Sequence, residues 1–200
     1  MLSINLLIKI EKKELSTIER KTQIMDIAYD LLVQRGYYDF SYADISEKIG
    51  IKKASIHYYF PTKESLVLQV IQRYRSNIQK KLAQLDESTE TPKSKIKAYI
   101  DYWNNCLNDS PNNICLCMHL ASSIPMLSAP IQKELQSHFT ELTSWISELL
   151  LENKTAVSQN DIQQLATDIL ATFHGAMLSA RVYQNSHYFT KISNDILKFF

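Results

Sequence analysis

The segment between Ser41 and Leu66 constrains the fold more than any other, because it contains two helix signals separated by a turn signal. Ser41 stands three residues before Asp44, a carboxylate form of the capping box that begins a helix. Gly50 then supplies a residue that tolerates positive φ at the turn. Pro61 ends the second helix, because the residue before a proline is pushed out of the α region. Two short helices joined by a glycine-containing turn predict a helix-turn-helix.

The positive charge of this segment lies toward its second helix, predicted from about Lys53 to Phe60. Between Lys48 and Lys63 there are four lysines and no acid, whereas the 200-residue chain carries a formal net charge of only +1. One alternative is a solvated, incidentally basic helix. The combination of turn, aromatic residues and lysines instead favours a surface for a polyanion, and a helix-turn-helix would place its second helix in the major groove of DNA.

A third helix follows directly, with Thr62 as its cap and Glu64 in its first turn, where the helix dipole favours an acid. The chain has only three glycines and five prolines, and helical periodicity recurs along it. We therefore expect an all-α fold. The predicted later helices cover about 63–85, 93–108, 114–123, 130–151 and 161–184, with a loop at 86–92 and a terminal segment at 188–200.

The residues from Gly36 to Leu66, GYYDFSYADISEKIGIKKASIHYYFPTKESL, resemble the DNA-binding domain of the TetR/AcrR family of transcriptional regulators. The most specific part is IHYYFPTKESL. Ser46 departs from the alanine that the family usually has, but serine is small enough for close helix contact. Lys52 replaces the common serine or threonine cap; it weakens the cap and adds a cation that can reach a phosphate.

The resemblance implies DNA contacts position by position. Lys53, Ala54, Ser55 and His57 would face base edges. Lysine can reach guanine acceptors, and an alanine methyl can meet a thymine methyl. Tyr59 and Lys63 would hold phosphates, and Tyr58 is also open to being a core residue. The full predicted DNA-binding set is Ser41, Tyr42, Lys52, Lys53, Ala54, Ser55, His57, Tyr58, Tyr59, Thr62 and Lys63, with Ser41 and Tyr42 touching the backbone from the preceding helix.

The resemblance also implies three parts: an N-terminal arm at 1–16, a helix-turn-helix domain at 17–66, and an effector-binding and dimerisation domain at 67–200. Ser16 and Glu19 form a capping box that predicts a first helix from Thr17 to Arg35, ended by Gly36. The apolar start of the chain lacks a basic region and a cleavage site, so we expect a flexible arm or an extra turn of helix rather than a signal peptide. Three cysteines without disulfide-like spacing fit a cytoplasmic protein.

The last two long helices carry broad apolar faces rich in small residues. By resemblance they would pair with their copies in a homodimer, through 130–151 and 161–184; the alternative is that they close the core of a single chain. The residues of these faces are Leu135, Phe139, Leu142, Trp145, Ile146 and Leu149 in the first helix, and Ile162, Leu165, Ala166, Ile169, Leu170, Phe173, Gly175, Ala176, Met177 and Ala180 in the second.

An effector pocket is a further implication of the resemblance, although an apolar stripe such as the one around Tyr99 and Trp103 usually forms core. Aromatic walls would suit a largely apolar or aromatic effector with one or two polar anchors. The absence of a carboxylate or arginine from the stripes disfavours a highly charged effector. The predicted wall residues are Tyr99, Trp103, Cys106, Met118, His119, Trp145, Phe173, His174 and Met177.

Cys115 and His119 share a helix face at i, i+4, which raises two further hypotheses. A metal site would need more ligands, so none is predicted. A redox or electrophile sensor at Cys115 would need access and a depressed thiol pKa. No glycine-rich phosphate loop, HExxH or nucleophile motif points to an enzyme or a cofactor. We therefore expect a ligand-responsive regulator, in the first instance a repressor released from operator DNA by a small effector; the alternatives are the Cys115 sensor and a helical protein-interaction module without an operator.

Overall fold

The structure is a computed structural model that describes the backbone of residues 4–88, 90–153 and 159–200, and side chains from residue 17 onward except 89 and 154–160. All regular elements in these ranges are helices, as the all-α prediction requires. The chain divides into two compact units, Met1–Val70 and Ile71–Phe200. The functional domain boundaries at 16/17 and 66/67 stay a prediction.

The first unit contains α1 (Ile4–Arg35), α2 (Tyr42–Ile49), α3 (Lys53–Tyr59) and the beginning of α4 (Lys63–Ser88). Helix α1 begins well before the predicted Thr17, so the Ser16 and Glu19 pair lies inside a helix instead of capping one. The physical reason is that no proline or glycine interrupts the chain before Gly36. Gly36 ends α1 with φ of 77°, as predicted.

The local signals of the helix-turn-helix are confirmed. Ser41 caps α2 through a full capping box with Asp44, and Gly50 adopts the left-handed conformation at φ 73°. Phe60 is extended before Pro61 and ends α3. The Thr62 hydroxyl accepts a 3.0 Å hydrogen bond from the Ser65 amide at the start of α4. The core that these helices share is fully buried and consists of Ile24, Ala28, Leu31, Leu32, Ile45, Ile56, Phe60 and Leu66.

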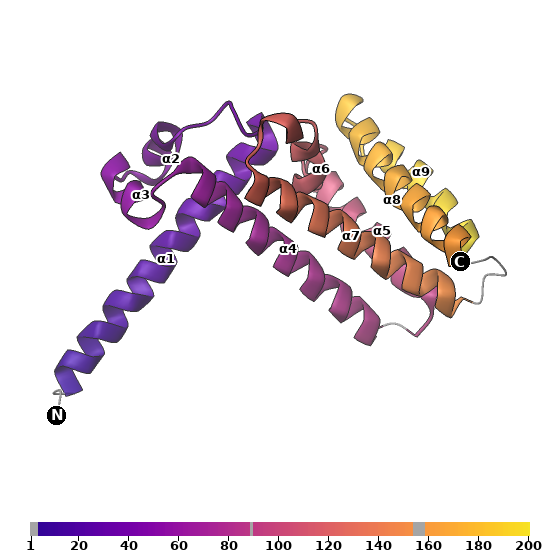
Figure 1. Ribbon diagram of the computed structural model, residues 1–200, viewed down its shortest axis with the longest axis horizontal. Helices are drawn as coiled ribbons and strands as arrows, with labels where there is room; N and C mark the ends of the chain where they lie inside the picture. Colours follow the sequence, from indigo (N-terminus) through magenta and orange to yellow (C-terminus); the bar gives the residue numbers. More distant parts are fainter. Residues whose placement is uncertain (1–3, 89, 154–158) are drawn as a thin grey trace. The chain divides into compact units, whose positions relative to one another are not determined.

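The second unit contains the rest of α4, followed by α5 (Pro92–Asp109), α6 (Leu116–Ala121), α7 (Ala129–Glu152), α8 (Gln159–Val182) and α9 (His187–Asn194). Short 3-10 turns lie at Ile124–Met126 and Asp195–Phe199. Figure 1 shows α8 and α9 as close neighbours; α8 packs against both α7 and α9, and α5 packs against the same two helices. Each of these amphipathic helices thereby buries its apolar face against two others.

Helix α4 extends to Ser88 and α5 begins at Pro92, so residues 86–88 and 92 of the predicted loop at 86–92 are helical. Asp86 stays helical because its carboxylate has partners in the second unit. It accepts hydrogen bonds of 3.1 and 3.2 Å from the Trp145 indole and lies 3.8 Å from Lys95. Polar composition predicted a loop, but these tertiary bonds support another turn of helix.

Charged side chains join α4 to α7 inside the second unit. The Arg75 guanidinium bonds the carboxylates of both Glu134 and Glu141, and Gln72 donates a 3.0 Å hydrogen bond to Glu134. These side chains are partly buried, where ion pairs are stronger than on an open surface. Helical periodicity did not predict this cluster, whose only signal in the sequence is the i, i+7 spacing of Glu134 and Glu141 on one helix.

Candidate functional site

The exposed face of α3 carries the predicted base-reading residues. Ile56 is fully buried and holds the helix against the core, which leaves the opposite face in solvent. Tyr58 is 79% exposed, so its interpretation as core is wrong and it stays with the surface set. The exposed predicted residues are Ser41, Lys52, Lys53, Ala54, Ser55, His57, Tyr58 and Thr62, while Tyr59 and Lys63 are half-buried.

An open hollow of about 450 Å³ lies between the start of α2 and the face of α3. It brings together residues predicted separately from the two helices. Two lysines and the N-terminus of α2 lie at this hollow. They provide hydrogen-bond donors and positive charge, which suit an anionic group. The lining residues are Phe40, Ser41, Tyr42, Ala43, Lys53, His57 and Lys63.

Asp44 fixes the start of α2 beside this hollow. Its carboxylate accepts 2.7 Å hydrogen bonds from the Ser41 hydroxyl and the Ser41 amide, and it pairs with Arg35 at 3.0 Å. These bonds, led by the one from the Ser41 hydroxyl, lower the pKa of Asp44 to about 2. The carboxylate is thus charged at neutral pH and holds the Ser41 side chain in place.

Tyr42 has a structural position. Its ring is 8% exposed, and its hydroxyl donates a 2.8 Å hydrogen bond to the Phe60 carbonyl at the end of α3. Burial raises the pKa of this hydroxyl to about 12. A DNA contact by Tyr42 stays a prediction, but its hydroxyl is not available for one while it bonds Phe60. The sequence placed Tyr42 at the right surface without revealing that its side chain turns inward.

Lys63 also has structural partners. Its ammonium group donates to the Phe40 carbonyl and lies 4.2 Å from the Phe40 ring centroid and 5.0 Å from that of Tyr37. Burial lowers its pKa, against the opposing effect of Asp39 and Asp44. Because an ammonium has three N–H groups, this arrangement leaves donors for a phosphate at the hollow.

His57 is held in a defined orientation on the exposed face. Its Nδ1 lies 3.2 Å from the Pro61 carbonyl oxygen, and its ring meets the Tyr42 ring edge-on with centroids 4.7 Å apart. The imidazole is therefore fixed from two sides, by the end of α3 and by α2. A fixed ring on an exposed helix face is suited to recognition.

The predicted effector walls meet in the core of the second unit. Tyr99 lies 6.4 Å from Trp103, 5.4 Å from Trp145 and 5.4 Å from Phe173, as ring centroids. All four rings are buried, and so are His174 and Met177, whereas Cys106, Met118 and His119 are half-buried. The structure thus brings four aromatic wall residues together and leaves the α6 residues nearer to solvent.

His119 has an arginine neighbour that the sequence pattern did not predict. Arg181 lies 3.1 Å from His119 Nδ1, and since a guanidinium only donates, Nδ1 must accept. Burial and the charge of Arg181 lower the pKa of His119. The remaining ring nitrogen, Nε2, is buried without a hydrogen-bond partner in the described part of the chain. Arg181 thus brings a positive charge to one predicted wall residue, although no arginine belongs to the predicted stripes.

The conditions for a reactive Cys115 are not met. The thiol is 1% exposed, and burial raises its pKa. Its neighbour is His138, with Sγ and Nε2 3.4 Å apart, and not the predicted His119. Low access and a raised pKa both oppose thiolate chemistry, so the redox alternative loses its physical basis.

Within the described residues no group of three or more metal-binding side chains occurs.

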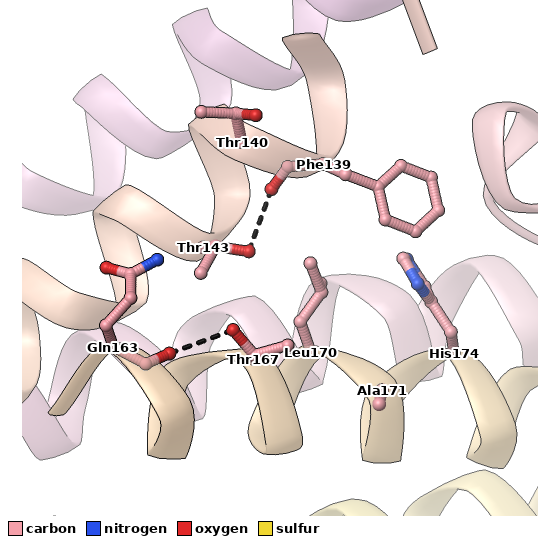
Figure 2. A pocket seen from close by; sticks show the side chains of 8 residues that line it. All are labelled: Phe139, Thr140, Thr143, Gln163, Thr167, Leu170, Ala171 and His174. Atoms are coloured by element: carbon pink, nitrogen blue, oxygen red, sulfur yellow. Dashed lines mark hydrogen bonds between the residues drawn. The ribbon is translucent and has the colours of Figure 1, made fainter. Parts of the chain in front are cut away.

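The outer face of α7 and α8 carries a second hollow, of about 400 Å³ (Figure 2). The Thr143 and Thr167 hydroxyls donate to the carbonyls of Phe139 and Gln163 on their own helices, at 2.9 and 2.8 Å. The hydroxyl protons of both threonines are thus already used inside the helices, while the hydroxyl oxygens can still accept. The lining residues, shown in Figure 2, are Phe139, Thr140, Thr143, Gln163, Thr167, Leu170, Ala171 and His174.

Most of the apolar residues predicted to pair two copies belong instead to the core of one chain, which was the alternative. The buried ones in α8 are Ile162, Ala166, Ile169, Leu170, Phe173, Ala176, Met177 and Ala180. A different stripe of α8 faces outward. Leu178 and Val182 are 52% and 67% exposed, and Thr167, Ala171 and Gly175 are also exposed.

Among the residues that the structure describes, no helix combines the length and apolarity needed to cross a membrane.

Each unit of the chain matches a known protein family. A family described as "Bacterial regulatory proteins, tetR family" matches residues 24–70. A second, described as "Transcriptional regulator LmrA/YxaF-like, C-terminal domain", matches residues 92–195.

Individual relatives agree over nearly the whole chain. The HTH-type transcriptional regulator LmrA of Bacillus subtilis is 25% identical over 90% of this chain and 97% of its own length. A TetR-family regulator from Agrobacterium tumefaciens has a solved structure that is 34% identical, with a TM-score of 0.85 over 90% of this chain and 96% of that one. A TetR regulator from Legionella pneumophila is 29% identical, with a TM-score of 0.80 over 88% and 94%. The helix-turn-helix, the helical second unit and these matches together show that the chain belongs to the TetR family of bacterial transcriptional regulators and is not an enzyme.

Proposed function

We propose that this protein is a ligand-responsive repressor that binds an operator as a homodimer in the cytoplasm and leaves it when a small effector binds. The observation that carries the proposal is the exposed face of α3, where Lys52, Lys53, Ser55 and His57 project beside the cationic hollow. Lysines at such a face suit guanine acceptors and phosphates. Family membership favours this function over an interaction module without an operator.

The assignment of contacts follows from exposure. Lys53, Ala54, Ser55 and His57 read base edges, because their side chains lie on the exposed face of α3. Tyr59, Thr62 and Lys63 contact phosphates together with Ser41. Lys52, which makes no cap bond with α3, is free to add another phosphate contact. Each such ionic contact releases counterions, so affinity should fall steeply as salt rises.

The direct test is fluorescence anisotropy on the DNA upstream of the protein's own gene, against scrambled DNA, across a salt series. We expect tight, salt-sensitive binding that prefers the upstream DNA. Equal weak binding to both sequences would mean that the operator lies elsewhere, to be sought by selection from random DNA. A lack of binding even at low salt would contradict DNA recognition by this face.

Dimerisation is part of the proposal because one small helix-turn-helix contacts too few base pairs to be selective. Two recognition helices related by a two-fold axis would lie about 34–36 Å apart, or a multiple of that distance, on a near-palindromic site. The outward stripe of α8, with Ala171, Leu178 and Val182, supplies exposed apolar side chains, and the adjoining hollow is lined by residues without acidic or lysine and arginine side chains, which suits such an interface.

Ala171→Arg tests this interface. A two-fold axis would bring two copies of the new charge to the same hollow, so we expect the dimer dissociation constant to rise at least about tenfold. Asn105→Arg, at another exposed position on α5, is the matched control and should leave the dimer intact. Sedimentation equilibrium measures both. An unchanged dimer in Ala171→Arg would move the interface to another face.

The effector part of the proposal rests on the aromatic cluster of Tyr99, Trp103, Trp145 and Phe173. These rings favour a largely apolar or aromatic molecule. The unpartnered Nε2–H of His119, beside Arg181, adds a donor for an acceptor group of the effector. A buried donor without a partner costs about 1–3 kcal/mol, which a bound acceptor would recover.

Coupling to DNA would pass through α4, which continues from the first unit into the second and is bonded to α7 through Arg75. An effector can shift this helix only if it binds the two states with different affinities. Calorimetry with a candidate effector, followed by anisotropy on the operator, tests the coupling. A ligand that binds well yet leaves operator affinity unchanged would contradict it.

A further inference from the structure

The orientation of His57 determines which of its ring nitrogens carries a proton. Its Nδ1 lies 3.2 Å from the carbonyl oxygen of Pro61. Pro61 directly follows Phe60, the residue that caps the C-terminal end of α3. A carbonyl oxygen can only accept a hydrogen bond, so Nδ1 must be the donor. The neutral ring then carries its proton on Nδ1 and a lone pair on Nε2.

The tautomer is stabilised by the position of the ring. The edge-on contact with Tyr42 restricts rotation of the imidazole, and Tyr42 is itself held by its bond to the Phe60 carbonyl. His57 is exposed, and Nδ1 is its one bonded nitrogen among the described contacts. Nε2 therefore remains as an acceptor on the face of α3.

This acceptor differs from its neighbours. Lys52 and Lys53 present only donors, and they suit guanine O6 and N7, thymine O4 or phosphate oxygens. The lone pair of His57 suits none of these, because each is itself an acceptor. The groups in the major groove that it can bind are the exocyclic amino groups, N6 of adenine and N4 of cytosine.

We propose that His57 is a specificity-determining residue that accepts a hydrogen bond from adenine N6 or cytosine N4, with its tautomer set by the Pro61 carbonyl. The proposal rests on the proposed function, in that α3 must enter the major groove. It assigns His57 to base recognition and not to phosphate binding. The free Nε2 lone pair and a phosphate oxygen are both acceptors, so no hydrogen bond can form between them.

The first experiment is selection of binding sites from randomised duplex DNA. The parent protein is compared with His57→Phe, which keeps a ring against Tyr42 but has no acceptor, and with His57→Asn, whose amide retains an acceptor as well as a donor. We expect His57→Phe to lose the preference at one base pair of each half-site and to keep the rest. Affinity for the parent's site should fall roughly two- to tenfold, the value of one hydrogen bond.

The second experiment removes the amino group from the DNA. At the affected position, purine replaces adenine, or 2-pyrimidinone replaces cytosine. The parent should lose roughly the same two- to tenfold in affinity, and His57→Phe should be insensitive. A long-range ¹H–¹⁵N spectrum of the free protein should show the proton of His57 on Nδ1.

The outcomes separate this inference from the proposed function. If the parent enriches no sequence, both the proposed function and this inference are contradicted. If it enriches a site that His57→Phe enriches with the same preference at every base pair, DNA recognition stands and the inference is overturned. A uniform loss on all sequences would place His57 at a phosphate, and a proton on Nε2 in the spectrum would remove the acceptor; each also overturns the inference.

Discussion

The two units of this protein use similar residues in opposite ways. In the first unit, polar and aromatic side chains such as Lys53, His57 and Tyr58 face solvent on a short helix that ends at the residue before a proline. In the second unit, the aromatic side chains of Tyr99 and Phe173 are buried among other helices. The exposed face of α3 is therefore assigned by local signals, whereas the burial of a side chain in the second unit depends on which neighbouring helix covers it.

The largest expected effect contrasts two faces of α8. Phe173→Ala removes a fully buried ring and should lower the free energy of unfolding by about 3–5 kcal/mol. Leu178→Ala, on the exposed stripe, should change it by less than about 0.5 kcal/mol within a single chain. Urea unfolding at several protein concentrations separates chain stability from dimer stability. Similar losses in both variants would contradict the division of α8 into a core face and an outer face.

A charge reversal on α3 should have the next largest effect. Lys52→Glu combined with Lys53→Glu should weaken operator binding by roughly a hundredfold or more, because two phosphate or base contacts become repulsive. Lys133→Glu combined with Lys191→Glu changes the net charge equally at exposed sites of the second unit. Anisotropy measures binding, and circular dichroism checks helicity. Equal losses in both double variants would mean that net charge, and not the α3 surface, governs affinity.

Acid should destabilise the second unit through its buried histidines. Burial lowers the pKa of His174 to about 4, from an ordinary 6.5. The unfolded chain therefore binds more protons between these values, so stability is full above about pH 6.5 and falls as the pH drops toward 4. We expect His174 to account for about 2 kcal/mol of loss between pH 7.5 and 5.

His174→Gln has no titrating ring at this position. Its free energy of unfolding should therefore fall by about 2 kcal/mol less than that of the parent between pH 7.5 and 5. Denaturant midpoints at each pH provide the measurement. His138, whose pKa burial lowers to about 3, remains in this variant and supplies a residual slope. An identical pH profile for parent and variant would show that His174 is not buried in solution.

The smallest effect tests the inward position of Tyr42. Tyr42→Phe removes the hydrogen bond to the Phe60 carbonyl and should lower the free energy of unfolding by about 1 kcal/mol. Tyr58→Phe, at a ring that is 79% exposed, should leave stability unchanged. Both are measured by urea unfolding. If Tyr42→Phe instead weakened DNA binding with no loss of stability, its hydroxyl would belong to the DNA contact set.

The sequence predicted the first unit closely for physical reasons that lie within a few residues. A serine and an acid three positions apart form a cap, a glycine permits positive φ, and a residue before proline leaves the helix. Each of these outcomes at Ser41, Gly50 and Phe60 was confirmed. The same logic failed at Ser16. A capping pattern marks the start of a helix only where the preceding chain is not helical, and no proline or glycine interrupts α1 before Ser16.

The second unit was less predictable because an amphipathic stripe does not state what covers it. The α8 stripe containing Phe173 was assigned to a dimer interface and lies in the core of the chain. Arg181 beside His119, Asp86 beside Trp145, and Arg75 between two glutamates join residues about 60 positions apart. No local pattern encodes such pairs.

By itself, the sequence determined the helical class, the positions of the turn and caps, and the cationic face of α3, because short-range sterics, hydrogen bonds and charge fix these features. The tertiary structure alone decided that Tyr42 turns inward, that the Cys115 thiol is sealed beside His138, and which face of α8 is left uncovered. Burial and partner choice depend on contacts between distant segments, and these exist only once the helices have packed.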